Sequence, residues 1–296
     1  MGHHHHHHHH SSEGNIKVAF FLNLAFTIIE FIGGFLTNSM AIMSDALHDL
    51  GDSLSLGLSW YFQKLSHKKG DTTFSFGYRR FSLLAALINS VILFVGSLYI
   101  LSEAIPRLLN PEETNAGGMM ILAVLGILVN GAAVFRLKSG KSMNEKVVSL
   151  HLLEDVLGWV AVLIVSIILM FTNWLFLDPL LSVLITLYII YNVLKNVKET
   201  VMIFLEAVPN DIDLKEIEQR ILGVDYVESL HHTHIWSLDG EHHALSTHVV
   251  VNEHASKHQI VCIKESIRAL KEELHLTHLT IEVEFADEDC VMKRET

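Results

Sequence analysis

Long apolar stretches alternate with short polar loops through the first two thirds of the chain. Each is long enough to cross the roughly 30 Å hydrocarbon core of a bilayer as an α-helix. None has the charged start and small-residue cleavage site of a removable signal peptide, so the first should stay as an anchor. The pattern predicts an all-α membrane domain of six transmembrane helices, at about residues 16–36, 40–62, 82–105, 117–136, 147–171 and 174–195.

Beyond residue 205 the long apolar stretches give way to short elements. Strand-like alternation on both sides of Asp239-Gly240, which is a common turn pair, predicts a β-hairpin. Amphipathic helices are expected before and after the hairpin, and a last strand follows them. The order αββαβ predicts a small α+β domain of ferredoxin-like or metallochaperone-like type, with elements at about residues 211–223, 226–238, 243–252, 256–274 and 279–285.

Composition changes at the same point in the chain. Half of the 296 residues are hydrophobic and 18% are charged, which is typical of a membrane protein. The segment from residue 205 onward holds 19 acidic and 8 basic residues, and this acidic balance argues against a nucleic-acid partner. We therefore predict an expression tag and linker at residues 1–14, a membrane domain at residues 15–204 and a soluble domain at residues 205–296.

The distribution of basic residues predicts the orientation in the membrane. Cytoplasmic loops accumulate Lys and Arg, and 12 of the 13 basic residues before residue 205 lie in loops of one parity, Arg107 being the exception. With six spans, both termini are then cytoplasmic. The two cysteines, Cys262 and Cys290, both lie in the soluble domain and provide no disulfide framework, which fits a reducing compartment.

Ionisable residues cluster in two of the predicted spans. A charge inside a transmembrane helix costs about 2.5 to 3.5 kcal/mol, so it indicates function. His48 and Asp52 lie one turn apart on the second span, and His151 and Asp155 lie one turn apart on the fifth. Because these two helices run in opposite directions, Asp52 and Asp155 both lie about 12 Å above the cytoplasmic surface. They can therefore meet at one centre.

Two imidazoles and two carboxylates form a ligand set that favours tetrahedral Zn²⁺. The two carboxylates also cancel the charge of a divalent ion. When the metal leaves, protonation relieves part of the cost of the buried charges, and we therefore hypothesise an exchange of metal for protons. Asp45 and Asp49 lie within about 60° of the same helix face, so they are candidate accessory ligands, entrance groups or water-facing structural residues.

The segments Ser44–Asp52, Leu150–Asp155 and Phe74–Arg80 resemble motifs of the cation diffusion facilitator family. The resemblance implies a homodimeric zinc/proton antiporter in the lipid bilayer, with a transport site in each protomer and cytoplasmic domains that dimerise and bind regulatory metal. Only about ten residues connect the fourth and fifth spans, at 136–145. The long His-rich loop of many eukaryotic members is therefore absent, which indicates a prokaryotic-type exporter of the plasma (inner) membrane.

The soluble domain is rich in histidine. By motif position, the resemblance implies that His232, His248 and Glu282 are ligands of the cytoplasmic metal site, with Glu284 as a further candidate. Strand alternation places His232 and His234 on one face and His231 on the other. The alternative is that these histidines are ordinary solvated residues of a hairpin.

Two other classes of function compete with zinc export. A membrane-tethered metal sensor would need only the soluble domain, and the buried His/Asp pairs speak against it. An intramembrane metalloenzyme would need an open metal position, whereas four protein ligands close the coordination shell. The chain also lacks the HExxH motif and a nucleophile elbow. We therefore expect a transporter and not an enzyme.

Overall fold

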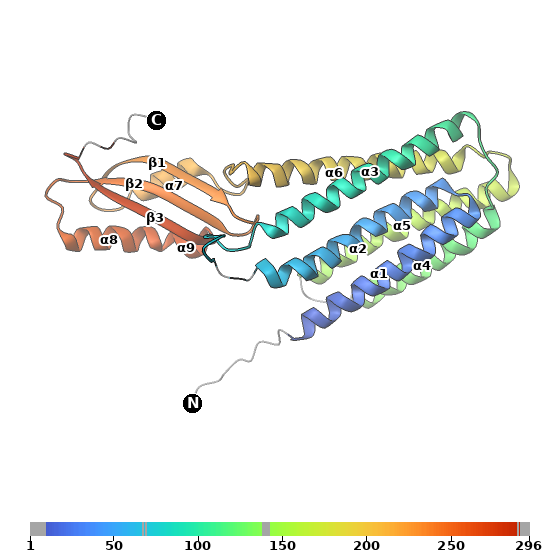
Figure 1. The fold of residues 1–296 in the computed structure, drawn as a ribbon, viewed down its shortest axis with the longest axis horizontal. Coiled ribbons are helices and arrows are strands. Elements are labelled where there is room, and N and C mark those ends of the chain that lie inside the picture. Colours follow the sequence, from blue (N-terminus) through green and yellow to red (C-terminus); the bar gives the residue numbers. More distant parts are fainter. Residues whose placement is uncertain (1–9, 67, 69, 138–142, 289, 291–296) are drawn as a thin grey trace. The chain divides into compact units, whose positions relative to one another are not determined.

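A computed structural model describes residues 10–66, 68, 70–137, 143–288 and 290 (Figure 1). Within these ranges it leaves undescribed the side chains of residues 10–19, 22, 59–60, 63–64, 66, 133, 136–137 and 143–152. Contacts divide the chain into two compact units. The first is helical and comprises Met1–Lys64 and Ala85–Val197, and the second comprises Leu65–Leu84 and Lys198–Thr296.

Long helices make up the first unit and account for the apolar stretches of the sequence. They are α1 (His10–Thr37), α2 (Met40–Ser66), α3 (Phe81–Leu109), α4 (Ala116–Leu137), α5 (Met143–Phe171) and α6 (Leu177–Phe204). Among the described residues, three helical segments are long and apolar enough to cross a membrane: α3, Leu153–Phe171 of α5, and α6. Shorter apolar segments lie in α1 and α4. The middle of α2 carries Asp45, Asp49 and Asp52, which lower its hydropathy.

The apolar side chains of these helices point mainly outward. Only 28%, 22% and 33% of the residues in the most apolar windows of α3, α5 and α6 are buried. Large exposed side chains such as Phe35, Phe135 and Phe171 lie on the outer surface. A water-soluble helical bundle would bury such side chains, whereas an apolar exterior suits a hydrocarbon environment.

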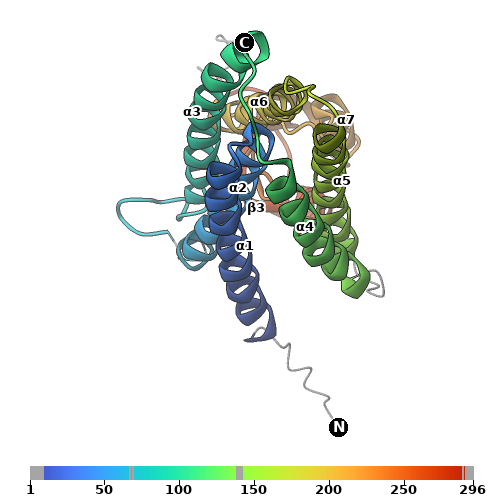
Figure 2. The same ribbon diagram turned by 90° about the vertical axis from the view of Figure 1, so that its right-hand side faces the viewer.

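Helices α4 and α5 approach each other closely, and Figure 2 shows them side by side. Trp159 of α5 is almost completely buried and packs edge-on against Phe26 of α1, with ring centroids 6.0 Å apart. A Cβ atom at Gly126 of α4 would lie 2.3 Å from the Trp159 ring. Glycine is therefore required at position 126, because an aromatic ring in a packed interior has little room to move.

The second unit contains the predicted α+β domain, and its element order confirms αββαβ. The elements are α7 (Leu214–Leu222), β1 (Val227–Ser237), β2 (His243–Val251), α8 (Lys257–Arg268), the short α9 (Leu270–Glu273) and β3 (Leu276–Phe285). The strand order is β1-β2-β3, with β1 antiparallel and β3 parallel to the central β2. The parallel pair is joined through α8 and α9, as a crossover connection requires.

Local sequence signals explain most of these boundaries. Ser256 and Gln259 form a reciprocal capping box at the start of α8. The element predicted from about residue 211 begins as helix α7 only after its N-cap, Asp213, whose side chain accepts a hydrogen bond from the backbone N–H of Lys215. In the hairpin turn Gly240 adopts a φ of +98°, which glycine tolerates without a steric penalty.

One apolar core holds this domain together. The central strand contributes Leu245, Val249 and Val251, and the helices contribute Ile221 and Ile263. All five side chains are at most 1% exposed. Alternate residues of β3 pack against the same core, which leaves the remaining β3 side chains for the opposite face of the sheet.

We expect the α4–α5 contact to be intolerant of a single added methyl group. Gly126→Ala should lower the thermal stability of the detergent-solubilised chain, because the new Cβ overlaps the Trp159 ring. Gly131→Ala, in the same helix, is the matched control, because no atom lies within 4 Å of its added Cβ. Equal melting temperatures for the two variants would contradict the close approach of α4 and α5.

Candidate metal centres

Helices α2 and α5 bring together three of the four predicted membrane ligands. Nε2 of His48 lies 3.8 Å from Oδ2 of Asp52 and 4.0 Å from Oδ1 of Asp155. A tetrahedral zinc site with N and O ligands has donor separations of about 3.3 Å. The His48 imidazole is therefore near both carboxylates, at separations somewhat longer than those of ligands that share one ion.

The fourth predicted ligand belongs to α5. Its backbone includes His151, one turn before Asp155, but the His151 side chain lies outside the described residues. Helix periodicity places residues 151 and 155 on the same face. The part of the site that the structure describes is therefore one imidazole between two carboxylates.

Three further acidic side chains are buried in the helical unit. Asp45 and Asp49, the candidate accessory residues of α2, are 6% and 5% exposed. Asp45 Oδ1 approaches α5, since it lies 3.5 Å from an ideal Cβ built at Gly158. Glu30 of α1 is 1% exposed and is an electrostatic neighbour of both aspartates. The candidate ligands therefore lie in a helical unit that buries several further acids.

Hydrogen bonds to an acceptor on α6 hold the N-terminal end of α2. Asp178 is fully buried and accepts hydrogen bonds from the Ser39 hydroxyl (2.5 Å) and from the backbone N–H groups of Met40 (2.7 Å) and Ala41 (3.3 Å). These contacts satisfy N–H groups that have no partner within the first turn of a helix.

A second contact extends this link between α2 and α6. The hydroxyl of Ser44 lies 2.6 Å from that of Ser182, and Thr186 donates a hydrogen bond to Ser44 at 3.2 Å. Asp178, Ser182 and Thr186 are spaced four residues apart and therefore share one face of α6. His48 follows Ser44 by one turn, so α6 positions the segment of α2 that carries the candidate ligands.

Helix α1 makes a corresponding contact farther along α2. The Asn23 amide donates to the Ser53 hydroxyl at 3.0 Å and to the backbone oxygen of Asp49 at 3.2 Å. Hydrogen bonds between helices of this kind are common in membrane proteins. The ligand-bearing turns of α2 are therefore supported on both sides by hydrogen bonds.

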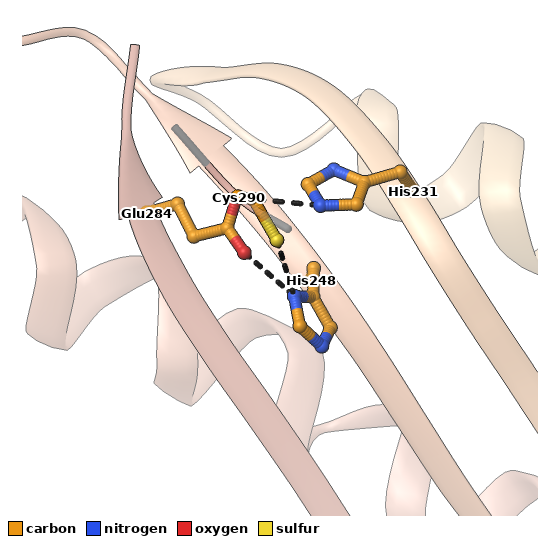
Figure 3. A group of neighbouring side chains, drawn as sticks. All are labelled: His231, His248, Glu284 and Cys290. Atoms are coloured by element: carbon orange, nitrogen blue, oxygen red, sulfur yellow. Dashed lines mark hydrogen bonds and ion pairs between the residues drawn. The ribbon is translucent and has the colours of Figure 1, made fainter. Parts of the chain in front are cut away.

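A second group of metal-ligating side chains lies on the α+β domain, on the sheet face opposite the apolar core. It consists of His231 of β1, His248 of β2, Glu284 of β3 and Cys290, and Figure 3 shows these side chains directed toward one another. One ligand atom from each lies within 4.8 Å of the others. The strand register explains the grouping, because His231 pairs with His248, and Val250 of the same strand as His248 pairs with Glu284.

Contacts within this group are short. Nδ1 of His248 lies 2.6 Å from Oε1 of Glu284, and Nε2 of His231 lies 3.3 Å from Oε2 of Glu284. Burial by itself would raise the pKa of Glu284, but hydrogen bonds with Cys290 and His248 and the nearby His231 outweigh it and lower the pKa. The carboxylate is thus favoured in its charged form, which is the form that binds metal.

The predicted alternation of side chains along β1 does not hold at His231. Alternation predicts His232 and His234 on one face and His231 on the other, but the register shifts between His231 and His234. His232 has a φ of +53°, so a β-bulge interrupts the alternation and places His231 in the group. The His232 ring still lies 5.5 Å from that of His248.

The two predicted glutamates occupy different positions. Glu284 is 8% exposed and is part of the group. Glu282 is 62% exposed, and its Oε2 lies 3.5 Å from the other ring nitrogen of His248, Nε2. Sequence reasoning missed His231 and left Cys290 unassigned. No signal in the sequence indicates the positive φ at His232 that changes the position of His231. For Cys290, the three acidic residues before it are a weak signal of a metal ligand.

Comparison with protein families matches both parts of the chain. Residues 16–205 match the family described as the cation efflux transmembrane domain, and residues 209–286 match the cation efflux protein cytoplasmic domain.

Curated relatives align over nearly the whole chain. A cadmium, cobalt and zinc/H⁺-K⁺ antiporter of Bacillus velezensis is 35% identical over 97% of this chain and 93% of its own. The metal cation efflux system protein CzcD of Cupriavidus metallidurans is 36% identical over 93% and 87%. The zinc transporter ZitB of Escherichia coli is 32% identical over 90% and 86%. All three are transporters and not enzymes.

One solved structure is also similar to part of the chain. It is the metal-bound C-terminal domain of the CzcD transporter from Cupriavidus metallidurans, which is 31% identical. The match covers 25% of this chain and 99% of that one, with a TM-score of 0.22.

We expect Asp178 to be essential for holding α2 in place. Asp178→Ala removes one side-chain and two backbone hydrogen bonds to a charged acceptor, and it should destabilise the helical unit by at least about 2 kcal/mol. Glu103→Ala, which removes an exposed carboxylate from α3, is the control. Unfolding in detergent followed by Trp fluorescence measures both, and equal stability of the two variants would contradict this role.

Proposed function

The chain belongs to the cation efflux family, also called the cation diffusion facilitators, and from that membership we propose that it exports Zn²⁺ from the cytoplasm in exchange for protons. Membership makes it an integral membrane protein that transports metal cations. The relatives' names include zinc, cadmium, cobalt and protons, and the preference for zinc and the coupling to protons are our proposals.

The observation that carries the proposal is the position of His48 between Asp52 and Asp155. An imidazole and two carboxylates suit Zn²⁺, whereas Mg²⁺, Ca²⁺ and Mn²⁺ prefer sets made only of oxygen. We propose His151 as the fourth ligand, because it precedes Asp155 by one turn of α5. Asp45 and Asp49 are proposed as accessory acids that attract the cation to the site.

Charge balance supports exchange with protons. A divalent ion held by two aspartates and two neutral histidines forms a site with no net charge. When the ion leaves, two carboxylates stay behind beside the buried acids Glu30, Asp45 and Asp49. Ionised groups in an apolar surrounding are costly, and protons that bind to the emptied site reduce this cost. Alternating access of this one site to the two membrane faces would then couple the two fluxes.

We further propose a plasma (inner) membrane location with both termini in the cytoplasm, on the basis of the basic loops. The cytoplasmic domain would form a homodimer and bind regulatory metal. His231, His248 and Glu284 support metal binding, because their donor atoms converge on one face of the sheet. The set that motif position implied, His232, His248, Glu282 and Glu284, shares His248 and Glu284 with this arrangement.

Transport in sealed proteoliposomes tests the proposal. We expect the unmodified chain to accumulate zinc on the side of higher proton concentration, and Asp155→Asn to reduce the initial rate by at least about tenfold, because it removes a charged ligand. His151→Ala should have an effect of the same order. Collapse of the pH gradient with an ionophore should abolish uphill accumulation in the unmodified protein.

The matched control is Glu154→Gln. Glu154 is exposed and adjacent in sequence to Asp155, but it lies about 100° away around α5, so the variant should transport at nearly the normal rate. Asp155→Asn with full transport would contradict the membrane site. Zinc binding without any flux would favour a membrane-tethered sensor over a transporter.

A further inference from the structure

A cysteine from beyond the last strand completes the metal-ligating group of the cytoplasmic domain. We propose that the Cys290 thiolate is the fourth ligand of a closed site for a thiophilic divalent cation such as Zn²⁺ or Cd²⁺, together with His231, His248 and Glu284. The inference rests on the proposed metal binding by this domain. It adds a ligand that lies outside the sheet and a preference among metals.

The chain reaches this position through a turn that is itself hydrogen-bonded. The backbone N–H of Phe285 donates to Glu288 Oε2 at 3.1 Å, and the N–H of Glu288 donates to the oxygen of Phe285 at 3.0 Å. Ala286 donates to Val251 of the neighbouring strand at 3.0 Å. The chain therefore turns at the end of β3, and Cys290 Sγ lies 3.9 Å from Nδ1 of His248.

The separations between donor atoms fit a single small ion. A tetrahedron with zinc bonds of about 2.0 to 2.3 Å has edges of about 3.3 to 3.7 Å. Of the observed contacts, 2.6 Å is shorter than this range, 3.3 Å lies at its lower end and 3.9 Å is slightly longer. The 2.6 Å contact between His248 and Glu284 is a hydrogen bond, and metal would replace its proton.

The burial of these polar side chains indicates that they do more than keep the domain soluble. The side chains of His231, His248 and Glu284 are only 8%, 9% and 8% exposed. Nδ1 of His231 is buried and has no hydrogen-bond partner among the described residues. Buried polar groups are costly in a domain with one small core, and a bound ion would recover that cost through its bonds to the ligands.

Charge and ligand type select the ion. Two neutral imidazoles, a carboxylate and a thiolate carry a charge that a divalent ion cancels. A thiolate favours Zn²⁺ and similar ions and disfavours Mg²⁺, Ca²⁺ and Mn²⁺, which prefer oxygen. Four protein ligands leave no open position, as in structural zinc sites. Metal binding would therefore fix the segment after β3 to the sheet.

The other cysteine offers an internal comparison. Cys262 of α8 lies 3.8 Å from His258, one turn earlier on the same helix. Among the described residues, no carboxylate or second histidine combines with Cys262 and His258 to form a group of three metal ligands. Two ligands on an exposed helix surface make a weak site, so Cys262→Ser is a matched control for Cys290→Ser.

Cobalt spectroscopy of the full chain tests the assignment. The eight histidines of the tag, His3–His10, should be deleted because they also bind Co²⁺. The reduced, solubilised chain titrated with Co²⁺ should show the visible bands of a tetrahedral ion and a near-ultraviolet thiolate-to-cobalt charge-transfer band. The membrane unit contains no cysteine, so cobalt at its His/Asp site cannot produce that band.

Cys290→Ser should abolish the charge-transfer band and weaken binding at this site by at least about tenfold, while Cys262→Ser retains both. Zn²⁺ should also protect Cys290 from alkylation more than Cys262. An unmodified chain that lacks the band at saturating Co²⁺, or a band that depends on Cys262, would overturn the proposal. Neither readout measures flux, so a failure here is distinct from a failure of zinc transport in proteoliposomes.

Discussion

The cost of placing acids and imidazoles inside an apolar bundle governs the organisation of the helical unit. His48 lies within 4.0 Å of both Asp52 and Asp155, and Glu30, Asp45 and Asp49 are buried nearby. Such a group is stable only if cations, either metal or protons, balance its charge. In the proposed exchange, the same constraint would couple metal to protons, because neither the empty nor the doubly occupied site is favourable.

The hydrogen bonds around α2 follow from this requirement. A metal site needs its ligands held to within a fraction of an ångström, and α2 carries two of the proposed ligands. Asp178 of α6 satisfies the first turn of α2, and Asn23 of α1 binds near its middle. Apolar packing around these helices, including the Gly126–Trp159 contact, stabilises the bundle but is not directional. Polar contacts thus set the position of α2, and packing holds α4 against α5.

The two metal centres differ in the ligands that they offer. The proposed membrane site has only nitrogen and oxygen donors, which would bind Zn²⁺ but allow its release. The cytoplasmic group adds sulfur and is closed by a segment that folds back after β3. A tighter, closed site suits a sensor that stays occupied while cytoplasmic metal is abundant, and a weaker one suits a transported ion.

Much of this arrangement could be predicted from the sequence, because it follows from local periodicity. The order αββαβ and the pairing of His48 with Asp52 on α2 need only the repeats of helix and strand. The role of Asp178 could not be predicted, because its partners lie far away in the chain. The β-bulge at His232 depends on a positive φ in a non-glycine residue, which tertiary packing imposes. For the same reason alternation failed for His231, and the turn that carries Cys290 had no pattern.

The most direct test of the account is the position of a bound ion in the membrane unit. The tag-free chain loaded with Cd²⁺ as a zinc analogue can be examined by anomalous diffraction or by single-particle imaging at side-chain resolution. The account predicts density for an ion within bonding distance of His48, Asp52 and Asp155, with His151 as the remaining ligand. An ion bound elsewhere in the membrane unit, with these side chains too far apart to share it, would contradict the account.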